Sequence, residues 1–94
     1  MRRKLVAGNW KMHGLVAALP EVEAIAQAAA IHPGVDVALC VPATLIAPAV
    51  TVAARMAPDN FGLGGQDCHA ADQGAHTGCI SAPMLAGAGA ALTI

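Results

Sequence analysis

The strongest constraint in this sequence is a repeated alternation of short extended segments with helical ones. Apolar and small residues predict four strands, at Lys4–Ala7, Val35–Val41, Phe61–Gln66 and Ala90–Ile94. Apolar residues at helical spacing predict helices over 19–31, over 44–56 and in a short stretch after Ser81. The strand centres are about 25 to 32 residues apart, the length of a βαβ unit. The pattern therefore predicts an α/β fold of the order β-α-β-α-β-α-β, with parallel strands joined by helical crossovers.

Residues with capping and helix-ending chemistry mark the ends of the predicted helices. The first helix ends where Pro33 and Gly34 follow it, and Thr44 is a candidate N-cap for the second. Ser81 is a candidate N-cap for the third helix, which we expect to end at Gly87 or Gly89.

Four parallel strands leave two open sheet edges, and a parallel sheet is ordinarily buried on both faces. The fourth predicted strand runs to the last residue, so no element follows that could cover the sheet. We therefore expect residues 1–94 to be the N-terminal portion of one larger domain.

Composition excludes several classes of function. The chain has five basic and six acidic residues and a net charge of −1. Its basic residues cluster only at Arg2, Arg3 and Lys4, and its only aromatic residues are Trp10 and Phe61. Nucleic-acid binding is not expected, because that function needs a basic surface and stacking side chains.

Neither a membrane span nor a disulfide framework is expected. Residues 37–54 carry no charge, but they include Pro42, Pro48 and several alanines and are too weakly apolar for a membrane helix. The apolar run after Lys4 is too short for a signal peptide. Three cysteines without a CxxC pair predict reduced thiols and a cytoplasmic location.

A glycine-bracketed loop follows the first predicted strand. It presents Asn9, Trp10, Lys11 and His13 between Gly8 and Gly14. Parallel α/β folds place their ligand sites at the carboxyl ends of the strands. The indole of Trp10 can anchor such a tight loop and fix its neighbours, so the loop is a candidate site rather than an ordinary charged surface.

A long polar segment follows the third predicted strand. It contains Cys68, His69, His76 and Cys79, which are residue types that bind zinc. Their spacing matches no established zinc pattern, and adjacent Cys and His cannot both face one ion without a sharp turn. A polar loop that contacts a ligand or a partner is the alternative interpretation.

Two segments carry a resemblance to a known family. The segment KLVAGNWKMHG at 4–14 resembles the opening of the triosephosphate isomerases, and GGQDCHAADQGAHTGCISAPML at 64–85 resembles their third strand, third loop and third helix. The similarity runs from Lys4 to Ile94 in order and spacing. It implies a (β/α)8 barrel, of which this chain would be the first four strands and three helices.

The resemblance also implies a function. The family interconverts dihydroxyacetone phosphate and glyceraldehyde 3-phosphate through an enediolate, as a cytoplasmic glycolytic homodimer without a cofactor. Lys11 would bind the phosphate and the developing oxyanion, and Asn9 would hold the lysine and the substrate in place. Thr77, with its neighbours His76 and Gly78, would reach the site of a second subunit.

The sequence departs from the family in ways that bear on activity. The family's electrophilic histidine and its catalytic glutamate occur in motifs that this chain does not contain, and neither His13 nor His76 replaces the histidine by position. Cys79 stands where the family usually has glutamate. We therefore expect the 94 residues alone to be inactive. A second hypothesis is a non-catalytic half-barrel that serves in folding or assembly and binds metal through Cys68, His69, His76 and Cys79.

Overall fold

The computed structural model describes residues 2–56 and 58–94, which form one parallel sheet with helices packed against it. The four strands lie side by side in chain order: β1 (Lys4–Asn9), β2 (Val35–Cys40), β3 (Phe61–Gly65) and β4 (Leu92–Thr93). Every neighbouring pair is parallel. The predicted alternation and the parallel sheet are therefore confirmed, and β1 and β4 form its two edges.

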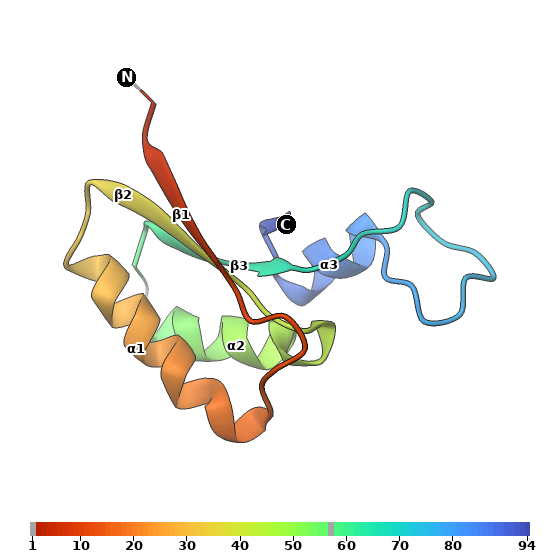
Figure 1. Ribbon diagram of the computed structural model, residues 1–94, viewed down its shortest axis with the longest axis horizontal. Coiled ribbons are helices and arrows are strands. Elements are labelled where there is room, and N and C mark those ends of the chain that lie inside the picture. The colour runs from red at the N-terminus through yellow and green to blue at the C-terminus, as the bar shows by residue number, and fades with distance from the viewer. Residues whose placement is uncertain (1, 57) are drawn as a thin grey trace.

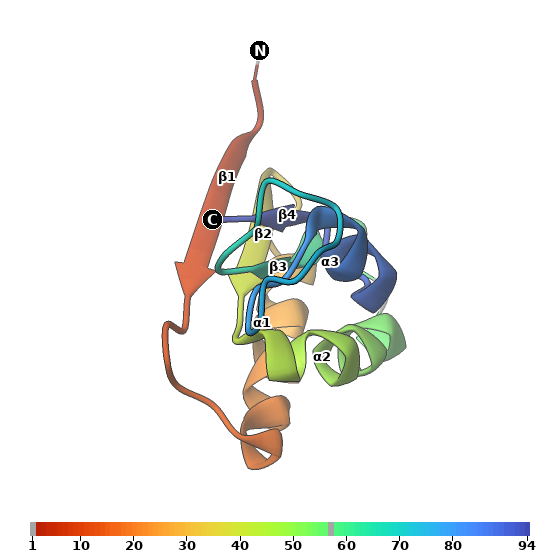
Figure 2. The same ribbon diagram turned by 90° about the vertical axis from the view of Figure 1, so that its right-hand side faces the viewer.

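Three α-helices connect the strands: α1 (Leu19–Ala30), α2 (Ala43–Met56) and α3 (Ala82–Ala88). A single 3-10 turn, η1 (Val16–Ala18), precedes α1 and was not predicted. The helices lie on one side of the sheet in the view of Figure 2. No helix among the described residues is long and apolar enough to cross a membrane.

The core lies between the sheet and the helices. Leu39, Val41 and Leu63 point from β2, its end and β3 toward the helices, and they pack with Val22 of α1 and Ile46 of α2. The apolar residues whose helical spacing predicted α1 do face the core, since Val22, Ala26 and Ala29 are buried while Leu19 and Ile25 pack beside it.

Some boundaries differ from the sequence prediction. β1 continues to Asn9, because backbone pairing with β2 runs through Asn9 and Cys40. β2 and β3 each end one residue earlier than predicted. β4 is only two residues long, because its ladder with β3 is limited to Gly64–Leu92 and Gly65–Thr93.

The helix caps show one wrong prediction and two confirmed ones. Thr44 is not an N-cap, since α2 already begins at Ala43 and Thr44 lies inside the helix. The Ser81 hydroxyl does cap α3, where its Oγ accepts a hydrogen bond from the Met84 amide at 3.3 Å. Gly89 ends α3 in the left-handed conformation, with φ of 101°, which a glycine adopts at little cost.

Asn60, just before β3, ties the end of α1 to the start of β2. Its Nδ2 donates to the carbonyl oxygens of Ala29 at 2.7 Å, Val35 at 2.9 Å and His32 at 3.1 Å. This side chain adds a donor to carbonyls at the end of α1 and the start of β2, of which those of Ala29 and His32 also accept from backbone amides. The contacts bring together segments about 25 to 31 residues apart in the chain.

Replacing Asn60 with leucine should lower the free energy of unfolding by about 2 kcal/mol, since the part-buried carbonyls of Ala29 and Val35 would each lose one hydrogen bond. The exposed neighbour Asp59 provides the control, because Asp59→Ala removes no described hydrogen bond and should change stability by less than about 0.5 kcal/mol. Urea denaturation of both variants measures the difference. Equal stabilities for the two variants would show that the Asn60 contacts contribute little.

Candidate active site

The first candidate site lies at the carboxyl end of β1, where the chain leaves the sheet. Asn9 is the last residue of the strand, and its Oδ1 accepts a hydrogen bond from the Lys11 amide at 2.8 Å. Lys11 has φ of 56°, and it is the only residue other than glycine with a positive φ in the described part of the chain. A long side chain in this conformation is uncommon, and such conformations concentrate at functional sites.

Trp10 anchors this loop to the core, as the sequence analysis predicted. Its amide donates to the Cys40 carbonyl at 3.0 Å, and its ring packs against the core beside Leu45. The ring also covers Gly14, where a Cβ atom would lie 2.9 Å from Trp10 Cε3 and 2.9 Å from Leu45 Cδ1. Gly14 also has φ of 111°, so both space and backbone conformation require glycine there.

Gln66, which follows β3, is a site residue that the sequence analysis missed. Its Nε2 donates to the Lys11 carbonyl at 2.9 Å and to the Cys40 carbonyl at 3.2 Å. The peptide that carries Lys11 is therefore held on one side by Asn9 and on the other by Gln66. The polar segment after β3 indicated a ligand or partner contact. No sequence pattern, however, predicts that Gln66 contacts Lys11, because the two residues are 55 positions apart.

Lys11 and Gln66 line a pocket of about 260 Å³ at the carboxyl ends of the first three strands. The other lining residues come from the ends of β1, β2 and β3 and from the region of α3: Met12, Pro42, Ala43, Asp67, Gly78, Ile80 and Leu85. A volume of this order approaches that of small-molecule sites. Asn9 does not line the pocket itself, but it borders the site through its bond to Lys11.

The pocket is lined by one cationic side chain, Lys11, and one carboxylate, Asp67. Lys11 is exposed, and the only ion pair between described residues joins Arg3 to Asp36, at 2.9 Å and at the opposite end of the strands. Asp67 lines the same pocket, but no described carboxylate forms an ion pair with the Lys11 ammonium. Its charge remains available to an anion that enters the pocket.

The loop of residues 66–81, between β3 and α3, holds the second group of predicted residues. It extends away from the sheet (Figure 1), and His76, Thr77 and Gly78 are exposed on it. Gly78 also lines the Lys11 pocket, with φ of 89°. The contact of these three residues with a second subunit stays a prediction.

The four-residue metal site of the second hypothesis is not formed in this loop. His69 and His76 face each other as stacked rings, with centroids 4.0 Å apart and planes 26° apart, so their nitrogens do not converge. Cys68 instead contacts the His69 carbonyl, with Sγ at 3.6 Å from the oxygen. Within residues 2–56 and 58–94, no three Cys, His, Asp or Glu side chains form a set that could hold a metal ion.

The three cysteines are free thiols in different surroundings. Cys40 is fully buried on the sheet, and burial raises the pKa of its thiol. Its Sγ lies where Gly64 leaves room, since a Cβ on that residue would come within 2.8 Å of the sulfur. Cys40 is therefore a packing residue, because a raised pKa leaves less of the nucleophilic thiolate.

The chain is similar to proteins of one family over its whole described length. The family model described as triosephosphate isomerase matches residues 4–94. The triosephosphate isomerases of Dinoroseobacter shibae and of a Jannaschia species are 58% and 54% identical to the chain over 94 residues. Both alignments cover 100% of this chain and 36% of the relative. The chain thus spans little more than a third of the length of these relatives.

A solved structure extends the similarity to the fold. The crystal structure of triosephosphate isomerase from Bartonella henselae matches with a TM-score of 0.81 and 43% sequence identity. The match covers 98% of this chain and 37% of that one. The sheet and helices described above correspond to the N-terminal half-barrel of a (β/α)8 barrel. The predicted fold class is confirmed, and the chain belongs to the triosephosphate isomerase family.

Proposed function

We propose that residues 1–94 supply the N-terminal portion of a single barrel domain that interconverts dihydroxyacetone phosphate and glyceraldehyde 3-phosphate. The observation that carries this proposal is the Lys11 ammonium, which has no described ion-pair partner and lies in a pocket at the carboxyl ends of the strands. Barrel enzymes of this fold act at that end. The relatives named above are triosephosphate isomerases, which supports the assignment.

In this proposal Lys11 binds the anionic substrate and stabilises the enediolate. Proton removal next to the carbonyl leaves negative charge on oxygen, and a fixed cation lowers the energy of that charge most when it needs no reorganisation. Asn9 and Gln66 hold the Lys11 peptide through its amide and its carbonyl. The chemistry includes no metal and no organic cofactor. The base and the electrophile would come from other parts of the barrel.

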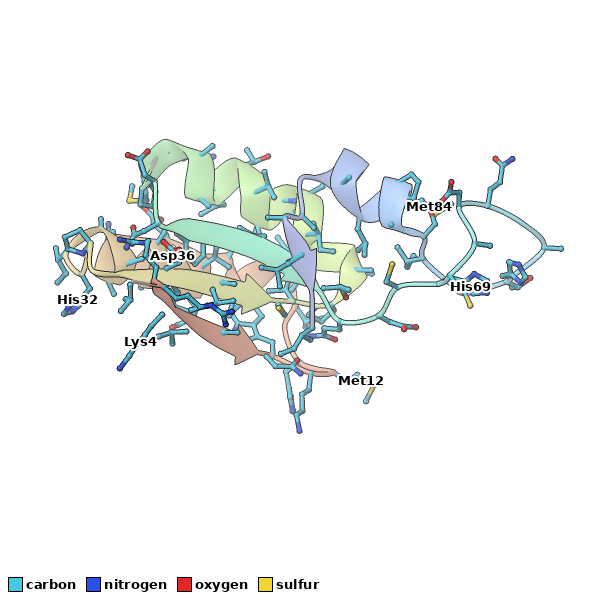
Figure 3. The ribbon with its side chains drawn as sticks, turned by 90° about the horizontal axis from the view of Figure 1, so that it is seen from above. Lys4, Met12, His32, Asp36, His69 and Met84 are labelled. Carbon is cyan, nitrogen blue, oxygen red and sulfur yellow. The ribbon has the colours of Figure 1, made fainter. Side chains whose placement is uncertain are left out.

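We also propose that the loop of residues 66–81 contacts a second copy of the barrel through His76, Thr77 and Gly78. Their exposure supports this, and so does the exposed apolar Met12 on the neighbouring loop, whose side chain is 93% exposed. Figure 3 shows Met12 pointing outward beyond the end of β1. A homodimer in a reducing, cytoplasmic setting fits these exposed loops and the free thiols.

A chimeric barrel tests the proposed activity directly. In it, these 94 residues replace the corresponding segment of the Dinoroseobacter shibae enzyme, which is 58% identical over that segment. We expect the chimera to isomerise triose phosphates at a rate within about tenfold of the parent. The reason is that Asn9, Lys11 and the catalytic residues of the parent barrel would keep their positions in the site. A folded chimera without measurable turnover would contradict the proposal.

Replacing Gln66 with leucine in the chimera should lower kcat/KM by about 10- to 100-fold, because the Lys11 peptide would lose one of its two anchors. Gln27→Leu is the matched control, because Gln27 is exposed on α1, far from the pocket, and should change the rate less than twofold. Steady-state kinetics on both variants provides the comparison. Equal rates would show that Gln66 does not position Lys11.

A further inference from the structure

The loop of residues 66–81 is closed at its base by backbone contacts. The His69 amide donates to the Ile80 carbonyl at 2.8 Å, and His69 also forms an isolated parallel bridge with Ser81. Figure 3 shows His69 in this loop, beyond the end of the sheet. The remaining part of the loop, residues 70–78, extends past this base and has few backbone bonds of its own.

A pair of imidazole rings joins the two arms of the loop above this base. The rings of His69 and His76 are stacked, with centroids 4.0 Å apart. His69 is partly buried and His76 is exposed. Gly74 packs against the ring of His76, since a Cβ atom on Gly74 would lie 2.8 Å from His76 Cδ2. The stack therefore closes the segment between the two histidines.

A hydrogen bond to the ring of His69 depends on a free lone pair at one of its nitrogens. Nδ1 of His69 accepts from the Ala71 amide at 2.9 Å. A nitrogen can accept only through a free lone pair, so this hydrogen bond requires that Nδ1 of His69 carries no proton. Protonation of Nδ1 would turn the acceptor into a donor that faces another donor. Protonation of both rings would also place two positive charges about 4.0 Å apart.

Within the described residues of this chain, no acidic side chain pairs with either ring. A small cavity beside the rings is also lined by Cys79, Ser81 and Met84, and the Cys79 thiol is its only other titratable group. The packed helix α3 carries no charged residue. Of the loop's two carboxylates, Asp67 accepts from the Cys68 amide, and Asp72 does not line the cavity. Among the described residues, neither histidine forms an ion pair.

We propose that the His69–His76 pair is a pH-sensitive latch that holds residues 70–76 closed when both rings are neutral and releases them on protonation. Histidine changes charge between about pH 5 and 8. The closed loop is therefore stable at the upper end of that range and is lost as the pH falls. Thr77 and Gly78 directly follow the latch, so acid would also loosen the segment that contacts a second subunit. Only this last consequence rests on the proposed function.

Hydrogen exchange at the Ala71 amide of the full chain tests the latch. After correction for the intrinsic exchange rate, its protection factor should fall about tenfold from about pH 8 to pH 5, the effect of losing one hydrogen bond. The double variant His69→Phe/His76→Phe keeps an aromatic pair without titratable nitrogens, and its Ala71 protection should be low at both pH values. His32→Gln removes an exposed histidine outside the loop and should retain the tenfold change.

Two outcomes would overturn the latch. One is Ala71 protection in the unmodified chain that does not change with pH. The other is a tenfold change that persists in the double variant. The unmodified chain alone can give the first result, so the test does not depend on the folding of a variant. Sedimentation velocity at the same pH values reports subunit association separately. Loop opening without a change in association would retain the latch and contradict only the proposed dimer contact.

Discussion

Replacing Lys11 with methionine in the chimeric barrel is expected to lower kcat/KM by at least about 100- to 1000-fold. One oriented electrostatic group at a transition-state charge typically contributes about 3–4 kcal/mol. Asn9 cannot take over, because an amide carries no charge. Both substrate binding and turnover should fall, since the same ammonium would meet the phosphate in the ground state and the oxyanion in the transition state.

The fold should tolerate this change. The Lys11 side chain is exposed and forms no described ion pair, and methionine keeps its length and much of its apolar stem. The hydrogen bonds that fix residue 11 use its amide and carbonyl, which every amino acid except proline provides. The melting temperature should therefore stay within about 2 °C of the parent chimera, as expected for a surface substitution.

Lys4→Met is the matched control for charge removal, because Lys4 is an exposed lysine at the opposite end of β1. Its kcat/KM should stay within about twofold of the parent. Steady-state kinetics and melting curves on the two variants separate catalysis from stability. If Lys11→Met retains activity within tenfold, Lys11 is a solvated loop charge and the site assignment is wrong.

The alternation of strands and helices was predictable, because the spacing of apolar residues and the capping residues within each segment specify it. Ser81 shows this, since an N-cap depends only on the amide three residues later. The ends of the strands were harder to predict, because pairing with a neighbouring strand decides them. Asn9 belongs to β1 only because Cys40 lies beside it in β2. Thr44 had suitable chemistry for a cap, but α2 begins one residue before it.

The site was predictable only in part, for the same reason. Asn9 and Lys11 lie within one short segment, so a local motif and the family resemblance both point to them. Gln66 reaches the Lys11 carbonyl from a different strand, and only the fold brings the two together. The histidines of the loop were candidate metal ligands by residue type, although their spacing matched no established zinc pattern. Their ring orientation, which sequence does not specify, instead makes them a stacked pair.

A polypeptide of these 94 residues alone is expected to be at least about 10⁴-fold less active than the chimera. The family uses a carboxylate base and a neutral imidazole electrophile, and these 94 residues contain neither of the motifs that supply them. Each such group typically contributes 10²- to 10⁴-fold. In the proposed mechanism Lys11 stabilises the enediolate, but an ammonium cannot remove the proton whose loss forms it.

The assay must exclude the host's own isomerase, so the polypeptide should be produced in cells that lack that enzyme. The decisive control adds the rest of the Dinoroseobacter shibae barrel as a separate polypeptide. Recovery of activity on mixing would show that the 94 residues carry a competent Lys11 site and lack only the groups supplied by the other strands. Turnover by the 94 residues alone within tenfold of the chimera would mean that a residue in this half acts as the base. The division of roles between Lys11 and the rest of the barrel would then be wrong.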